Sequence, residues 1–535
     1  MSMNGTFRQS MTWLHTWSGI VVVWLLYFMF VTGTLGYFDD EIDLWMKPEV
    51  GPSEQAPLNV TVPRLQAWLE KEKSDADLWF LYPTVKRTNP HPGVFYQLPA
   101  ISDDDEVRGR QDFNLTAGRP LDEVRETGGG QVLYRMHYLL HYLPGLSGYY
   151  VMAVVTMFMF VGLMTGVVAH KKIFKDFFTL RWAKGQRTWL DLHNVASVAT
   201  LPFQFMITYS GLLFTLSLLW MPLVVVGGYG FEVDRIKQVV ESIQGESIDR
   251  ANIPANQFPL VDLANQAELA WGKDRIAYIR VDYPGDANSR VTIGREGFGR
   301  ANRDSITFDG VSGVPIDDES RGSLDNNAAF AVANVMLSLH EGTFANYVLR
   351  WLYFLSGLLG TVMIGTGAIY WVEKRRPKSS DNPGTESFRA VERANVATIA
   401  GLIAAVGLYF MANRLLPVDF PQRADWEVHC MFLAWLALFV HSALRPPLVA
   451  WREQCSIIAI IFLALPVVNE LTTDVGLLQT LDAGNWRLAG FDITAIVTGM
   501  AAAVIAYRIN VLREPTERKA ASNQIQQPLL TPADS

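Results

Sequence analysis

Six of the nine histidines lie at the ends of long apolar segments of the chain. They are His15, His137, His141, His170, His193 and His340. An ionisable side chain within a membrane usually has a partner or a function. Neutral imidazole is also a common axial ligand of haem iron. The residue type and its placement therefore indicate haem binding as the chemistry to consider first.

An internal repeat arranges these histidines in pairs. His15 in LHTWSG matches His193 in LHNVAS, and each is followed at the same distance by a hydroxyl residue and a glycine, Thr32–Gly33 or Ser210–Gly211. Two such copies, related by a two-fold axis along the membrane normal, would place His15 opposite His193 near one face of the membrane. They would place His340 opposite His137 or His141 near the other face.

The choice between His137 and His141 stays open in the sequence. The two residues are four apart and would share one face of a helix, so that one could bind iron while the other contacts a haem propionate or relays protons. His141 is favoured because it is closer to the apolar run. The sequence thus predicts two bis-histidine haem sites with His15, His193, His141 and His340 as iron ligands and with His137 as a further cofactor contact.

Hydroxyl–glycine pairs are expected beside both sites. Gly33 lies about 27 Å from His15 along a helix at ~1.5 Å per residue, and so it reaches the opposite site. The matching segments LMTGVVAHKK and IGTGAIYWVEK place Gly166 and Gly367 near the first site. Glycine leaves space for a flat macrocycle and lets helices approach closely. Gly19 is expected to leave such space one turn from His15.

The other histidines carry weaker signals. His170 stands beside two lysines and is interpreted as interfacial. His429 and His441 share one apolar segment but are about 120° out of phase on a helix, so they are interpreted as interfacial or as minor contributors. His91 lies in a loop and is interpreted as structural or surface-exposed.

Composition favours a membrane protein and excludes several other classes. Half of the 535 residues are hydrophobic, the net charge is −8, and the chain has two cysteines. The charge argues against nucleic acid as a partner. Two cysteines rule out a disulfide framework, a zinc ribbon and a four-cysteine iron–sulfur site. The glycine-rich segment 294–300 is not followed by a βαβ pattern, so a dinucleotide site is not expected and electrons must come from a separate donor.

Eight segments are long and apolar enough to span a bilayer, which predicts an α-helical polytopic membrane protein. They lie at about 16–38, 147–169, 194–220, 347–371, 395–416, 428–444, 455–469 and 491–508. The basic loops HKKIFKDFFTLRWAKGQR and EKRRPK contrast with the acidic DDEID after the first span. The positive-inside rule therefore places those basic loops and both termini in the cytoplasm.

Two large insertions follow the first and the third spans, and each mixes β-prone and amphipathic helical stretches. The sequence predicts that each forms a small α+β domain outside the membrane. The last four spans lack the repeat and form an appended module. The expected units are 1–38 (N-terminus and first span), 39–146 (first domain), 147–220 (second and third spans), 221–346 (second domain), 347–376 (fourth span), 377–508 (appended module) and 509–535 (a disordered cytoplasmic tail).

The stretch WLHTWSGIVVVWLLYFMFVTG, the paired TG corners and the NLTAGRPL-type turns resemble the PepSY-associated transmembrane helix family, over about residues 8–376. That family includes iron-regulated inner-membrane proteins and ferric-siderophore reductases. The resemblance implies two PepSY-like periplasmic domains and a bacterial inner-membrane protein that carries electrons through two haems to a ferric siderophore. The electron donor would be a quinol or a cytoplasmic reductase. The appended module departs from the shorter reductases.

Two other functions fit the same sequence. A non-enzymatic membrane regulator or assembly factor would use the PepSY-like domains to bind peptides or a protease, with the helices as anchors. An iron-chelate transporter would favour intramembrane carboxylates or broken helices, and the sequence offers few of either. We expect a haem-dependent ferric-siderophore reductase, because this function gives the paired histidines a role.

Overall fold

A computed structural model describes most of the chain. The described residues are 6–51, 55–85, 87, 91–99, 108–114, 119–121, 124–170, 175, 177, 179–182, 184–229, 249–273, 275–295, 305–316, 328–376 and 385–525. Residues 115–118 of the NLTAGRPL turn, the segment 296–300 and the last ten residues of the expected tail lie outside this part of the chain.

Seven described helices are long and apolar enough to cross a membrane, and the number is eight if one bent pair counts as a single span. The seven are α1 (Phe7–Leu35), α5 (Ser147–Ala169), α13 (Tyr347–Arg375), α14 (Thr385–Leu415), α15 (Arg423–Leu444), α16 (Pro447–Thr472) and α18 (Trp486–Ile525). Together with their hydropathy, this makes the chain a multi-pass membrane protein. The short expected span at 455–469 belongs to α16, which has 26 residues.

The third expected span is broken into two helices. α7 (Gln186–Ala199) and α8 (Leu201–Tyr229) meet at Thr200 with a bend of 70°. Pro202 is the second residue of α8 and has no N–H to donate to the carbonyl of Val198, so the hydrogen-bond ladder of α7 cannot continue through it. The bend therefore gives α7, which carries His193, a different direction from α8.

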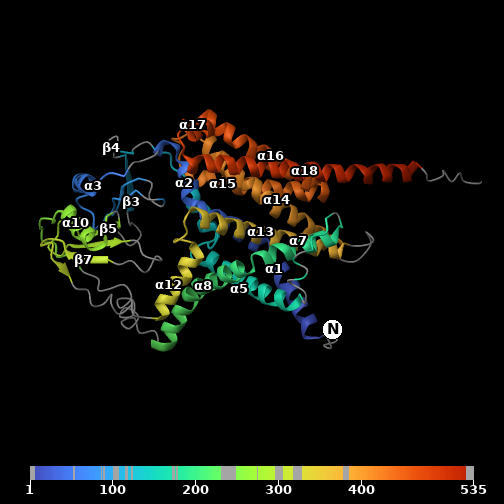
Figure 1. Ribbon diagram of the computed structural model, residues 1–535, viewed down its shortest axis with the longest axis horizontal. Helices are drawn as coiled ribbons and strands as arrows, with labels where there is room; N and C mark the ends of the chain where they lie inside the picture. Colours follow the sequence, from blue (N-terminus) through green and yellow to red (C-terminus); the bar gives the residue numbers. More distant parts are fainter. Residues whose placement is uncertain are drawn as a thin grey trace, which may run out of the picture.

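The two insertions build one continuous antiparallel sheet (Figure 1). Its eight strands run in the order β4-β3-β2-β1-β5-β6-β7-β8. The bounds are β1 (Leu78–Tyr82), β2 (Gly93–Gln97), β3 (Arg108–Asn114), β4 (Arg119–Pro120), β5 (Ile276–Asp282), β6 (Arg290–Arg295), β7 (Ser305–Asp309) and β8 (Pro315–Ile316). The first four strands come from one insertion and the last four from the other, in mirrored order, as a two-fold repeat requires.

The seam between the insertions is the pairing of β1 with β5, in which Leu81 stands opposite Ile279. The separate domains expected at 39–146 and 221–346 therefore share one sheet. They also share one core, because α3 (Leu58–Glu72) and α10 (Leu260–Trp271) pack on the same face of it. Figure 1 shows both helices on the side of the sheet away from the membrane helices.

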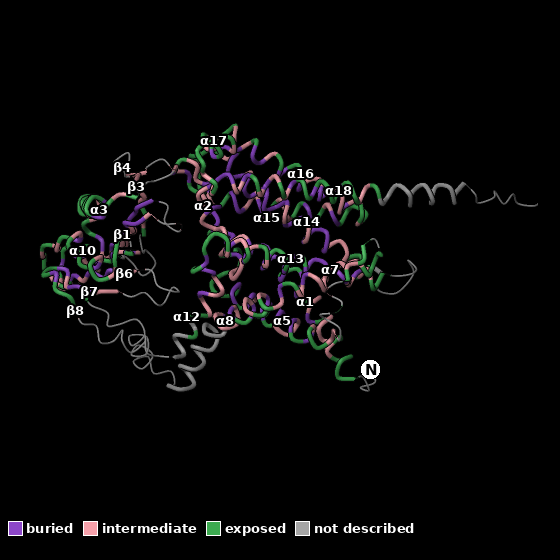
Figure 2. Tube along the Cα trace, in the orientation of Figure 1, coloured by how far each residue is buried: buried purple, intermediate pink, exposed green. Residues whose placement is uncertain are grey.

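The helices form two groups beside the sheet. α1 packs against α5 and α13, and α13 packs against α7, which makes the repeated half of the bundle. The appended helices α14, α15, α16 and α18 pack on one another and contact α13, α1 and the short helix α2 (Asp39–Met46) of the repeated half. Buried residues gather where these helices face one another and beneath α3 and α10 (Figure 2).

Shorter helices connect these parts. They are α2 (Asp39–Met46), α4 (Gly129–Met136), α12 (Ala328–Glu341) and α17 (Leu477–Asp482). The short 3-10 turns are η1 (Gly36–Phe38) and η2 (Pro48–Val50). α18 continues to Ile525, so the tail expected to be disordered from 509 is helical as far as that residue.

Candidate functional site: two pairs of histidines

The structure brings four of the predicted histidines together in two pairs. His15 on α1 and His193 on α7 have ring centres 6.2 Å apart, and we call them the far-side pair because they lie at the end of the bundle remote from the sheet. His137, which caps the C-terminus of α4, and His340 on α12 have ring centres 6.0 Å apart and form the sheet-side pair. Equivalent positions of the repeat supply each pair.

His141 does not belong to either pair, although the sequence favoured it as the partner of His340. Its ring lies against Tyr142 and Phe432, with centres 4.7 Å and 6.3 Å away. The reason is local: α4 ends at Met136 and the chain turns before α5 begins. His137 and His141 are therefore not on one helix, and the four-residue spacing does not put them on a common face.

Each of the four paired rings has its Nδ1 atom held by a hydrogen bond to a neighbouring helix. The bonds are all 2.8 Å long and join His15 to the carbonyl of Gly162, His193 to that of Met363, His137 to that of Met29, and His340 to the hydroxyl of Ser210. In a metal site, the nitrogen that does not bind the metal makes this kind of bond, which sets the orientation of the ring.

These bonds determine where the ring proton lies. A carbonyl oxygen only accepts, so Nδ1 of His15, His193 and His137 must donate. The Ser210 hydroxyl donates to the carbonyl of Met206 at 2.7 Å and so accepts from His340. With Nδ1 protonated in a neutral ring, Nε2 carries a free lone pair, and this is the form of imidazole that binds a metal ion.

Burial keeps the sheet-side rings neutral. It lowers the pKa of His340 to about 3, with the neighbouring His137 contributing in the same direction. Burial also lowers the pKa of His137. Both rings are therefore unprotonated at physiological pH, as ligation requires.

A glycine lies directly against each paired ring. A β-carbon on Gly33 would lie 2.7 Å from Cε1 of His137, and the corresponding distances to Cε1 are 3.0 Å for Gly166 and His15, 3.1 Å for Gly367 and His193, and 3.3 Å for Gly211 and His340. The sequence predicted these glycines beside the sites, as space for a macrocycle and for close helix approach. In the structure each of them lies against a paired imidazole.

The hydroxyl residue before each glycine completes a recurring device. Thr165 donates to the carbonyl of Gly162, which also accepts from His15, and Thr366 donates in the same way to the carbonyl of Met363, the acceptor for His193. For His15, His193 and His137, the accepting carbonyl lies four residues before the glycine, whereas His340 bonds to the Ser210 hydroxyl. The sequence reasoning missed these acceptors, and the four-residue offset shared by three of the hydroxyl–glycine corners is the signal that identifies the carbonyls.

The far-side pair lines a cavity of about 360 Å³ between α1, α5, α7 and α13. Gly19 lines it as well, and a β-carbon at Gly19 would meet nothing within 4 Å, which agrees with the space expected there. Lys374 and Arg375 line the same cavity, as does His170. Its walls are mainly apolar, with cationic side chains among them.

The sheet-side pair lines a second cavity, of about 680 Å³, which opens among α1, α4, α8 and α12. Arg87 and Arg350 line it together with Asp39 and Asp40. Arg87 pairs with Asp40 at 2.6 Å, and Arg350 donates to the carbonyl of Tyr37 at 3.1 Å. This cavity is larger and more polar than the far-side cavity.

The remaining histidines are bound elsewhere. Tyr142 and Nδ1 of His429 lie 2.7 Å apart, and Nε2 of His441 lies 2.9 Å from a carboxylate oxygen of Glu453. His91 is buried, with Nε2 2.9 Å from the carbonyl of Gly51. Within the described part of the chain, no group of three or more His, Cys, Asp and Glu side chains is placed to hold a metal ion by itself.

One helix serves both pairs. α1 carries His15 near its start and, near its end, the Met29 carbonyl and Gly33 that receive His137. α13 likewise carries Met363 and Gly367, which receive His193. Each ring is thus held by a glycine and an acceptor from its own copy of the repeat, and each pair combines one ring from each copy.

The model of the PepSY-associated TM region matches residues 12–374, which confirms the resemblance in the sequence. The match covers both histidine pairs, all four hydroxyl–glycine corners and the strands of the shared sheet, and it ends before the appended helices. None of the curated proteins matches the chain. The chain belongs to the family of proteins that contain the PepSY-associated TM region.

Proposed function

We propose that each histidine pair holds one b-type haem and that the chain carries electrons across a bacterial inner membrane to ferric iron in the periplasm. The spacing of the rings carries this proposal. A metal–imidazole bond is about 2 Å long and a ring nitrogen lies about 1.1 Å from its ring centre, so two imidazoles on opposite sides of one ion have centres roughly 6 Å apart. The two pairs measure 6.2 Å and 6.0 Å.

The side chains around each cavity suit the rest of such a group. Haem propionates are carboxylates, which bind most strongly to cationic donors. Lys374 and Arg375 line the far-side cavity, and Arg350 and Arg87 line the sheet-side cavity, where Arg87 also pairs with Asp40. Nε1 of Trp371, which also lines the far-side cavity, is buried with no hydrogen-bond partner among the described residues.

The protein's own contribution is to place and orient the ligands. A haem held by the two histidines of a pair would exchange single electrons and would leave no iron position open for oxygen chemistry. Three backbone carbonyls and the Ser210 hydroxyl fix the rings, and the four glycines let the rings lie close to the helix backbone. The two pairs lie at opposite ends of α1, about 27 Å apart along its axis at ~1.5 Å per residue. That length is close to the roughly 30 Å of the hydrocarbon core that an electron must cross.

The proposed direction follows from the charges of the loops and from the family resemblance. With the basic loops and both termini in the cytoplasm, the far-side pair faces the donor, a quinol or a cytoplasmic reductase. The sheet-side pair and its larger, polar cavity then face the periplasm and the acceptor, a ferric siderophore. One electron reduces the chelated iron from ferric to ferrous, which oxygen ligands hold more weakly.

A reduced-minus-oxidised spectrum of the purified full-length protein tests the proposal. We expect the bands of a low-spin b-type haem, with loss of one haem in His193→Ala and of the other in His137→Ala. His141→Ala is the matched control and should keep both. A colourless protein would overturn the proposal and leave the anchored regulator as the better reading.

Once haem is established, stopped-flow mixing of the reduced protein with a ferric siderophore tests the acceptor. We expect oxidation of the haem bands together with capture of ferrous iron by a ferrous-specific chelator. Reduced protein that stays reduced in the presence of the chelate would refute the proposed acceptor while leaving the haem assignment intact.

A further inference from the structure

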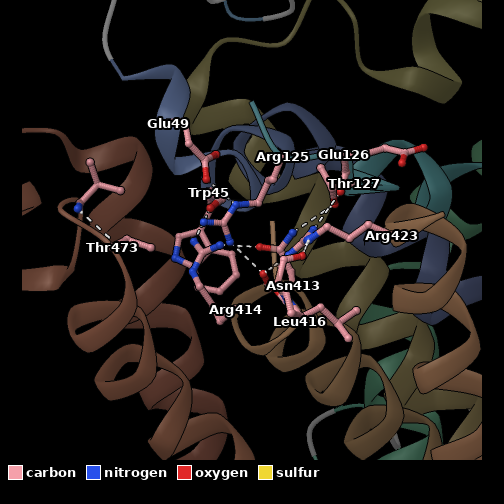
Figure 3. A network of polar contacts seen from close by, with 12 residues as sticks. Trp45, Glu49, Arg125, Glu126, Thr127, Asn413, Arg414, Leu416, Arg423 and Thr473 are labelled. Atoms are coloured by element: carbon pink, nitrogen blue, oxygen red, sulfur yellow. Dashed lines mark hydrogen bonds and ion pairs between the residues drawn. The ribbon is translucent and has the colours of Figure 1, made fainter. Parts of the chain in front are cut away.

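The appended helices hold the chain that leads into α4 by hydrogen bonds, and we call this contact the grip (Figure 3). The carboxylate of Glu427 on α15 accepts from the Thr127 hydroxyl at 2.5 Å and from the backbone N–H of Gly128 at 3.2 Å. Arg423, one turn earlier on α15, donates to the carbonyl of Glu126 at 2.8 Å. The appended module thus satisfies backbone and side-chain groups of consecutive residues just before a helix of the repeated half.

A second appended helix reinforces this grip. Tyr409 on α14 donates to the carbonyl of Gly129 at 2.8 Å, and the amide of Asn413 donates to the Thr127 hydroxyl at 3.2 Å. In return, Arg125 donates to the carbonyl of Asn413 at 2.8 Å. Figure 3 shows Arg125, Thr127 and Asn413 close together in this contact.

The charges in this contact are buried and paired. Glu427 and Arg423 are both 0 % exposed, and they form an ion pair of 2.5 Å with each other. Arg125 pairs with Glu49 at 2.7 Å. A buried ion pair gives little net stability, but removing one partner leaves an uncompensated charge in the interior. Such an arrangement is therefore suited to fixing the position of the chain before α4, because a displaced chain would leave these buried charged groups without their partners.

Three consecutive glycines let the chain pass through this contact. A β-carbon on Gly128 would lie 2.8 Å from the Tyr409 hydroxyl, and β-carbons on Gly129 and Gly130 would overlap the Asp43 carboxylate and the backbone of Asp39. Gly129 also has a φ of +60°, which favours glycine. The GGG sequence thus fits between α2 on one side and the appended helices on the other.

The segment that is gripped begins the helix that ends at a sheet-side histidine. α4 has eight residues, about 12 Å of helix at ~1.5 Å per residue, and His137 is its C-cap. In the last turn of α4, the Tyr134 hydroxyl donates to the carboxylate of Glu341 at 3.1 Å, and Glu341 directly follows His340. A short helix fixed at its first residues leaves little freedom at its last turn.

We propose that Glu427 is a positioning residue for His137, and that the appended helices brace the sheet-side pair through α4. Glu427 holds the start of α4, and α4 sets the depth and rotation at which His137 faces His340 and reaches the Met29 carbonyl. This inference rests on the proposed function only for the identity of the group held between the two rings.

Hydrogen exchange of the full-length protein in detergent, measured by mass spectrometry, tests the brace without any cofactor. In Glu427→Ala we expect the amides of α4 to exchange about tenfold faster or more, since a hydrogen bond to a charged group is worth at least that factor. The amides of α7, which carries His193, should not change. Tyr409→Phe is the milder variant and should speed exchange in α4 roughly two- to tenfold.

The matched control is Asp492→Ala. Asp492 is also a fully buried carboxylate of the appended module, but it accepts from Trp45 and Asn469 and does not contact the chain before α4. We expect this variant to leave exchange in α4 near that of the wild type. Equal effects of Glu427→Ala and Asp492→Ala on α4, or equal acceleration of α7, would mean general loosening and would overturn the proposal.

The midpoint potentials of the two haems provide a second measurement, which tests whether the grip affects the position of His137. In a potentiometric titration of Tyr409→Phe, we expect the midpoint potential of one haem to move and that of the other to stay, with Asp492→Ala moving neither. Two unchanged potentials beside faster exchange in α4 would show that the grip does not reach His137. If the protein binds no haem, the proposed function fails, and the exchange comparison still decides whether the brace exists.

Discussion

The imidazole of His137 lies directly against Gly33, so closely that a β-carbon on the glycine would stand 2.7 Å from Cε1. The same ring donates from Nδ1 to the carbonyl of Met29, one helical turn earlier on α1. The position of His137 is thus defined by the absence of a side chain at one residue and by a backbone acceptor at another.

Gly33→Ala should displace His137 and remove the haem that we propose at the sheet-side pair. Overpacking a close contact costs about 1–3 kcal/mol, which the ring can avoid only by giving up its bond to Met29. We expect the haem content per protein, measured by the pyridine haemochrome assay, to fall by about half. Gly490→Ala is the control, because the nearest atom to its β-carbon is the Tyr347 hydroxyl at 3.9 Å. Full haem content in Gly33→Ala would contradict the docking role of the glycine.

Gly19→Leu should block the far-side cavity while leaving the protein folded. The added side chain meets no atom near its β-carbon and projects into the space beside His15. Leucine is also a better helix former than glycine by roughly 1 kcal/mol. We therefore expect an unchanged or higher melting temperature together with loss of one haem from the spectrum. Retention of both haems would mean that the cofactor does not occupy this cavity.

Arg375→Met should lower the midpoint potential of the far-side haem. Loss of a positive charge beside the cavity disfavours the reduced state of the haem, which is the more negative one. We expect the midpoint potential to fall by on the order of tens of millivolts, since a tenfold change in the redox equilibrium constant is 59 mV for one electron. Redox potentiometry measures the shift. Arg376→Met provides the comparison, because this neighbouring guanidinium pairs with Glu373 and Glu392 at 2.6 Å and 2.8 Å. Equal shifts in the two variants would argue against a local effect of Arg375.

Ile279→Ala should destabilise both insertions together. Ile279 lies on β5 and is 0 % exposed in the core that both insertions share, where removal of such a side chain costs about 2–5 kcal/mol. Limited proteolysis should then cut the first insertion as readily as the second. Leu269→Ala on the 88 % exposed side chain of α10 should have little effect. Cleavage confined to the second insertion would show that the halves of the sheet are independent.

The histidine pairs were predictable because they depend on a repeat that is visible in the sequence. His15 and His193 have the same neighbours and the same distance to a hydroxyl–glycine corner, so one comparison aligned both. His137 could not be separated from His141 in this way. The decision rests on where α4 ends, and helix ends are set by local contacts, here the turn that follows Met136.

The shared sheet could not be predicted for a different reason. Leu81 and Ile279 are almost 200 residues apart in the chain, and the pairing of edge strands at such a separation leaves no local pattern. Each insertion looked complete because each has a helix and its own alternating strands. The grip on α4 was hidden likewise, since Glu427 resembles any charged residue near the start of a helix until its partners are known.

The seam between β1 and β5 joins equivalent strands in antiparallel register, which is the geometry of an isologous dimer interface. A chain with one copy of the repeat would expose that strand as an open edge and would have one histidine of each pair. Two such chains, joined edge to edge, would complete the sheet and both pairs at once. The present protein therefore has the architecture of a homodimer joined into one polypeptide, and its two halves can differ, as they do at Thr32 and Ser210.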